Sequence, residues 1–140
     1  MYQSHQTGKR IIGDTTNQSG PGPYIMAANT LVGDKVVNES GDDLGTLKHI
    51  MVDVVGGTIP YAVLSFGGIL GMGDKLFAVP WGSLVLDADN EWFVLNVPKD
   101  RLENAPGFDK NDWPDMADER WRSEVSGYYG PAAPQSMPFI

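Results

Sequence analysis

The chain has 140 residues and no cysteine, and its 10 Lys and Arg against 18 Asp and Glu give a formal net charge of −8. This composition excludes disulfides, thiolate metal sites and thiol catalysis. It also disfavours nucleic-acid binding, because that affinity depends on basic side chains that neutralise phosphates. A hydrophobic fraction of 41% is sufficient for one core, while 17 glycines and 10 prolines favour short strands and turns over long helices.

The composition changes along the chain and divides it into four segments. Residues 1–29 are largely polar and rich in glycine and proline, so we expect a mostly disordered tail. Residues 30–97 are predicted to form the folded domain. Residues 98–130 are predicted to form a short helical extension, and residues 131–140 a flexible tail. No secretory signal and no stretch near the roughly 20 apolar residues of a membrane span is visible. We therefore expect a cytoplasmic protein that does not insert into a membrane.

The folded segment predicts six short strands separated by turns. The first contains Leu31, Val36 and Val37, and the others cover residues 44–55, 59–66, 75–79, 83–86 and 91–97. The third has an almost continuous apolar run, which indicates burial on both faces. A glycine-rich hairpin at residues 67–73 joins the third strand to the fourth. Strands at this spacing, without intervening helices, predict an all-β fold: a small barrel of about six strands.

The extension is predicted to contain one or two helical turns at residues 98–103, ended by Pro106-Gly107, and a short helix over residues 115–125. Ala117, Trp121 and Val125 recur at helical spacing and form one apolar stripe. Gly127 is expected to end this helix.

Several of these segments together resemble the PRC-barrel domain, a family named after the cytoplasmic domain of the photosynthetic reaction-centre H subunit. The matching runs are LVGDKV at 31–36, Gly41 with Leu44-Gly45, IPYAVLSFGG at 59–68 and LGMGDKLFAVPW at 70–81. Trp113-Pro114, Trp121 and Tyr128-Tyr129-Gly130 are similar to the C-terminal extension of stand-alone bacterial members. A related barrel forms the C-terminal half of a bacterial ribosome maturation factor. The resemblance implies a small β-barrel with a scaffold or interaction role, and it carries no catalytic residues.

Three acidic clusters resemble calcium sites in their content of carboxylates. They are Asp42 with Asp43, Asp87 with Asp89, and the group at residues 109–119. None has the alternating oxygen ligands, central glycine and terminal glutamate of a calcium-binding loop. Turn and cap roles are the better interpretation, so we expect no metal site.

Enzymatic chemistry finds equally little support. His49 and Asp53 share a predicted strand, but no serine or cysteine nucleophile pattern accompanies them. The glycines at 67–73 lead into a strand and lack the Gly-Lys-Ser/Thr sequence of a phosphate loop. We therefore expect no catalytic residue, no bound cofactor and no enzymatic activity.

The residues that point to function are apolar and aromatic. Trp81 and Trp92 fall within the predicted barrel segment and are assigned to the core. The remaining candidates lie at the glycine hairpin or outside the barrel, and tryptophan and tyrosine dominate interface hot spots; they are Ile69, Leu70, Met72, Trp113, Trp121, Tyr128 and Tyr129. This pattern predicts a self-associating interaction or assembly module, a dimer or higher oligomer.

Two other functions stay open at this point. One is a ligand-binding barrel that takes a small apolar or anionic molecule. The other is an assembly factor that docks a basic partner from a ribosomal or membrane complex, since the acidic chain favours a basic surface.

The glycine hairpin generates a direct test of self-association. Leu70→Asp combined with Met72→Asp should reduce the oligomer mass while the domain stays folded, because charge opposes burial of the hairpin. The measurement is light scattering after size exclusion, with circular dichroism to verify the fold. An unchanged oligomer mass would remove this hairpin from the interface.

Overall fold

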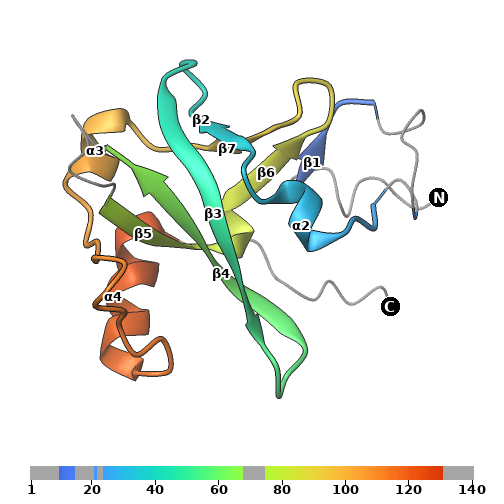
Figure 1. The fold of residues 1–140 in the computed structure, drawn as a ribbon. Coiled ribbons are helices and arrows are strands. Elements are labelled where there is room, and N and C mark those ends of the chain that lie inside the picture. The colour runs from blue at the N-terminus through green and yellow to red at the C-terminus, as the bar shows by residue number, and fades with distance from the viewer. Residues whose placement is uncertain (1–9, 15–20, 22–23, 68–74, 131–140) are drawn as a thin grey trace.

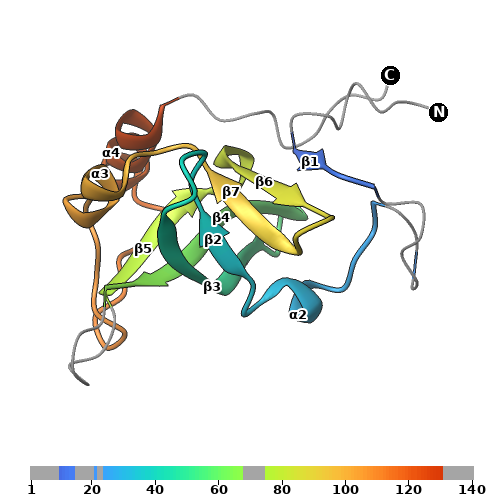
Figure 2. The same ribbon diagram turned by 90° about the horizontal axis from the view of Figure 1, so that it is seen from above.

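The computed structural model describes residues 10–14, 21, 24–67 and 75–130, and seven strands within them form one mixed sheet (Figures 1 and 2). The strands are β1 (Ile11–Ile12), β2 (Lys35–Val37), β3 (Asp43–Asp53), β4 (Thr58–Phe66), β5 (Lys75–Pro80), β6 (Leu84–Asp87) and β7 (Trp92–Leu95). Four short helical elements accompany them: α2 (Ala28–Leu31), the 3-10 helix η1 (Trp81–Ser83), α3 (Lys99–Glu103) and α4 (Glu119–Tyr129).

The strand order across the sheet is β1-β6-β7-β2-β3-β4-β5. The β1–β6 and β2–β7 pairs are parallel, and the others are antiparallel. The order has two ends, so the described residues form a β fold without showing the closed barrel that the sequence predicted. Figure 2 shows α3 and α4 at one end of the molecule, and α2 and β1 at the other.

The predicted strands differ from the observed ones at the beginning of the domain. Leu31 belongs to helix α2 rather than to a strand, and β2 begins only at Lys35. Thr30 stabilises the helical turn, because its hydroxyl donates to the carbonyl of Ala27 at 2.7 Å. The additional strand β1 falls within the segment predicted to be largely disordered. It pairs with β6, whose Leu86 N–H donates to the Arg10 carbonyl at 2.8 Å.

The core lies where the inward faces of these strands meet. Its completely or almost completely buried members come from β2 through β7 and from α3: Val36, Leu44, Leu47, Leu64, Phe77, Val79, Leu84, Leu95 and Leu102. The middle of β4 is buried without interruption from Tyr61 to Ser65, which confirms the predicted burial of this strand on both faces. One face points into the core, and Tyr61 meets Trp121 of α4 with ring centroids 5.0 Å apart.

Helix α4 is displaced from its predicted position. It begins after Asp118, whose carboxylate accepts a hydrogen bond from the Arg120 N–H at 2.9 Å and thereby caps the helix. Gly127 lies inside the helix, and the chain leaves it at Gly130, where φ is +80°. Val125 is buried, whereas Ala117 lies outside the helix and is exposed.

Among the described glycines, Gly45 in β3 leaves the least room for a side chain. Its φ is +101°, and a Cβ built there would lie 2.1 Å from the Ser65 carbonyl oxygen of β4. The next residue, Thr46, pairs with both Lys35 of β2 and Ser65. A side chain at position 45 would therefore disrupt the point at which β3 joins its two neighbours.

Two glycines allow this approach to be tested against backbone strain alone. Gly33 has a similar φ of +99°, but a Cβ there would meet nothing within 4 Å. We expect Gly33→Ala to lower the free energy of unfolding by about 1–3 kcal/mol through strain. Gly45→Ala should cost a further about 1–3 kcal/mol or more through overlap with β4. Urea denaturation measures both variants, and equal losses would show that the approach at Gly45 relaxes freely.

Candidate interaction surfaces

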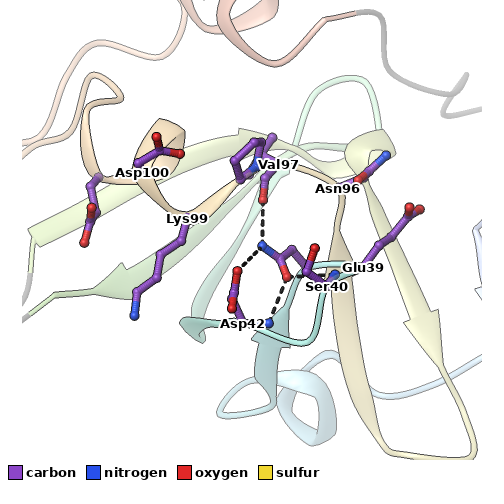
Figure 3. A pocket seen from close by; sticks show the side chains of 10 residues that line it. Glu39, Ser40, Asp42, Asn96, Val97, Lys99 and Asp100 are labelled. Carbon is purple, nitrogen blue, oxygen red and sulfur yellow. Dashed lines mark hydrogen bonds between the residues drawn. The ribbon is translucent and has the colours of Figure 1, made fainter.

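A polar hollow of about 450 Å³ lies between the turn after β2 and the connection from β7 to α3 (Figure 3). Asn38 lies at its base and is almost completely buried. Its Oδ1 accepts from the backbone N–H groups of Ser40 and Asp42 at 3.0 and 2.8 Å. Its Nδ2 donates to the Asp42 carboxylate at 3.2 Å and to the Val97 carbonyl at 3.1 Å. Asn38 thus uses both donors and both acceptor positions to join the two segments.

The rim of this hollow does not form a recognisable ligand site. Four carboxylates and one ammonium group line it, from Glu39, Asp42, Asp100, Glu103 and Lys99. In Figure 3 the side chain of Lys99 points away from Ser40 and Glu39. Across the part of the chain that the structure describes, no three His, Asp or Glu side chains come together as a metal site would need. We interpret the hollow as a structural junction between the turn after β2 and the segment that leads to α3.

Asn38 gives a stability prediction with an internal control. Asn38→Ala leaves the Val97 carbonyl and two turn N–H groups without this partner, so we expect the free energy of unfolding to fall by about 1–3 kcal/mol. Asn96 lines the same hollow but is exposed, and Asn96→Ala should change stability by less than about 0.5 kcal/mol. Thermal and urea unfolding provide the comparison. Equal effects would contradict a joining role for Asn38.

The predicted aromatic residues of the extension make contacts within the chain. Trp121 packs against Tyr61, and the rings of Tyr128 and Tyr129 meet at 5.2 Å. The Arg101 guanidinium of α3 lies 4.1 Å from the Tyr128 ring centroid and donates to the Tyr128 carbonyl at 2.6 Å. In return, the Tyr128 hydroxyl donates to the Arg101 carbonyl. These contacts attach the end of α4 to α3 and leave the three aromatic side chains half-buried.

Tyr129 is packed so that its hydroxyl group is buried. Its hydroxyl is buried without a hydrogen-bond partner, and burial raises the pKa of Tyr129 well above its usual value. The raised pKa keeps the phenol neutral throughout the physiological range, so Tyr129 contributes apolar packing rather than acid–base chemistry.

Trp113 is the most exposed of the predicted aromatic residues, with 40% of its surface accessible. Its ring lies 5.3 Å from His49 and 5.0 Å from Phe108, and its Nε1–H donates to the Lys110 carbonyl at 2.9 Å. His49 therefore contacts an aromatic side chain. Ile69, Leu70 and Met72 of the glycine hairpin lie outside the described residues. Of the two tryptophans assigned to the core, Trp81 packs against it and Trp92 is half-buried.

The sequence interpretation missed the apolar end of the β3–β4 hairpin. Val52, Val54 and Val55 are 57%, 86% and 95% exposed. We call residues 52–57 the β3–β4 tip, and in Figure 1 the hairpin extends beyond the rest of the fold. The Asp53 carboxylate holds its turn by accepting from the Val55 and Gly56 N–H groups at 3.1 and 3.0 Å. The available signal was a pair of valines directly before Gly56-Gly57, where polar residues are usual.

Comparison with known proteins agrees with this fold. The family model of the PRC-barrel domain matches residues 25–102, which is more than half of the chain. The chain therefore belongs to the PRC-barrel family. No curated protein matches the chain. The helices of the described residues are all too short or too polar to cross a bilayer.

Proposed function

We propose that this chain is a non-enzymatic PRC-barrel interaction module that self-associates through the β3–β4 tip. The observation that carries the proposal is the exposure of Val54 and Val55, whose side chains lie almost entirely in solvent. Water contact with apolar surface is unfavourable, and burying that surface is the main driving force of protein association. Membership of the PRC-barrel family supports a role as a module.

Charge supports the tip as the contact between two copies. A net charge of −8 makes identical chains repel one another at most approaches. Asp53 is the one charged residue of the tip, since residues 54–57 carry no charged side chain. Its carboxylate accepts hydrogen bonds from two turn N–H groups, which partly offset its charge, so like-charge repulsion between two tips comes from one carboxylate on each. A two-fold contact would place each tip against the same surface of its partner.

The extension aromatics support a different role. Trp121 and Tyr128 contact Tyr61 and Arg101 of their own chain, so they stabilise the attachment of α4 to the domain. Trp113 remains available at the surface and can extend an interface that the tip begins.

A single substitution tests the tip, because symmetry places it twice in the interface. Val55→Asp should shift the sedimentation profile from oligomer to monomer at a given concentration. Val32→Asp is the matched control, since Val32 is an exposed valine at the end of α2 and away from the tip. We expect Val32→Asp to keep the wild-type profile.

Sedimentation, together with a binding measurement, distinguishes self-association from the alternatives. A wild-type chain that sediments as a monomer over the whole concentration range would contradict self-association. An oligomer that Val55→Asp leaves intact would exclude the tip from the interface. Salt-sensitive binding of a purified basic protein by monomeric chain would instead favour the assembly-factor role.

A further inference from the structure

A second cavity, of about 410 Å³, lies between the N-terminal segment and the sheet. Its walls come from β1, the segment around α2, β3, β4, η1, β6 and β7, and they are largely apolar. The lining side chains are Arg10, Ile11, Tyr24, Ile25, Met26, Ala28, Leu31, Ile50, Ile59, Trp81, Leu84, Leu86 and Phe93. This volume falls within the about 300–1,000 Å³ of small-molecule sites, which are typically apolar with few polar groups.

Arg10 is the one charged residue among these lining residues. Backbone pairing holds it in place, because its carbonyl accepts from the Leu86 N–H at 2.8 Å. Its Nη2 lies 3.4 Å from the Trp81 carbonyl, and the guanidinium carbon lies 6.0 Å from the Trp81 ring centroid. Its Nη1 is buried and has no hydrogen-bond partner.

An unpaired cation beside apolar walls is unfavourable. Burial lowers the pKa of Arg10, but arginine keeps its proton in proteins, so the group cannot escape the cost by becoming neutral. A buried donor without an acceptor loses the hydrogen bonds that water would supply. An anionic group in the cavity beside the guanidinium would offset its positive charge.

Exposed apolar surface at the rim of the cavity is a second indication of a ligand. Tyr24 and Ile25 line it, yet they are 46% and 69% exposed. An apolar body in the cavity would cover this surface. Trp81 and Phe93 form an aromatic part of the wall, with ring centroids 5.9 Å apart. The site therefore combines one anion-binding donor with an extended apolar surface.

We propose that this cavity binds a small amphiphilic monocarboxylate, with the carboxylate beside the Arg10 guanidinium and the apolar body along Trp81 and Ile25. One guanidinium group balances one negative charge. The net charge of −8 opposes ligands with more. Val55 is absent from the lining residues, so the site does not depend on self-association through the β3–β4 tip.

Calorimetric titration of the full chain with three octyl compounds tests the proposal. Octanoate, 1-octanol and octylammonium share one apolar body and differ in charge, and all are used below their micelle concentrations. We expect octanoate to bind at least about 10-fold more tightly than 1-octanol, because the anion adds a charge-assisted hydrogen bond. Octylammonium should bind most weakly. Octanoate should also shift the indole resonance of Trp81 in a nitrogen-15 NMR spectrum.

Two arginine variants locate the anion. Arg10→Met should weaken octanoate binding by about 10- to 100-fold and leave 1-octanol binding unchanged, which also shows that the cavity is intact. Arg120→Met is the matched control, since Arg120 is exposed on α4, and it should behave as wild type. If Arg10→Met fails to fold, Arg10→Lys replaces it and should keep the preference for octanoate over 1-octanol.

Three results would overturn the proposal. The first is no binding of octanoate. The second is equal affinity for octanoate and 1-octanol in the wild-type chain, which would indicate an apolar cavity without anion selectivity. The third is equal loss of octanoate binding in Arg10→Met and Arg120→Met, which would indicate a general charge effect.

Discussion

The close approach of β3 to β4 at Gly45 determines how the sheet is assembled. The first part of β3 pairs with β2, its longer second part pairs with β4, and Thr46 takes part in both ladders. β2 also pairs with β7, and β7 pairs with β6. Leu44 and Leu47, on either side of this point, are both completely buried. The junction of the two ladders of β3 therefore lies beside completely buried core residues, and a side chain at position 45 would disturb both.

Sequence reasoning succeeded where a signal was local and failed where a partner was distant. The apolar run of β4 revealed its burial directly. Strand β1 has two residues, and it exists because β6, far along the chain, offers its edge; no local pattern contains that information. Two residues near the start of α4 could each have been its N-cap. Asp115 and Asp118 both accept a hydrogen bond from a nearby N–H group at 2.9 Å. Both residues fit a cap, and the sequence pattern alone did not separate them.

The candidate surfaces show the same division. Aromatic residues beyond the strands predicted an interface, but the sequence did not show that Trp121 would meet Tyr61 or that Arg101 would cover Tyr128. Val54 and Val55 were predicted as the last residues of a strand, whereas they lie in the turn that follows Asp53, where they are exposed. Arg10 was not recognised as a candidate site residue, because it lies in a polar segment of the sequence. Its importance depends on Trp81 and Leu86, which only the folded chain brings near it.

The pairing of Leu76 with Phe108 has a consequence for aggregation. The two residues exchange backbone hydrogen bonds at 2.9 and 2.8 Å, so the loop after α3 occupies part of the free side of β5. At the opposite end of the sheet, β1 offers two residues. Within the described residues, neither end of the sheet presents a long row of unpaired N–H and C=O groups, the template from which strands of other molecules grow into fibres. The fold can expose valines at a hairpin turn and still resist amyloid-like stacking.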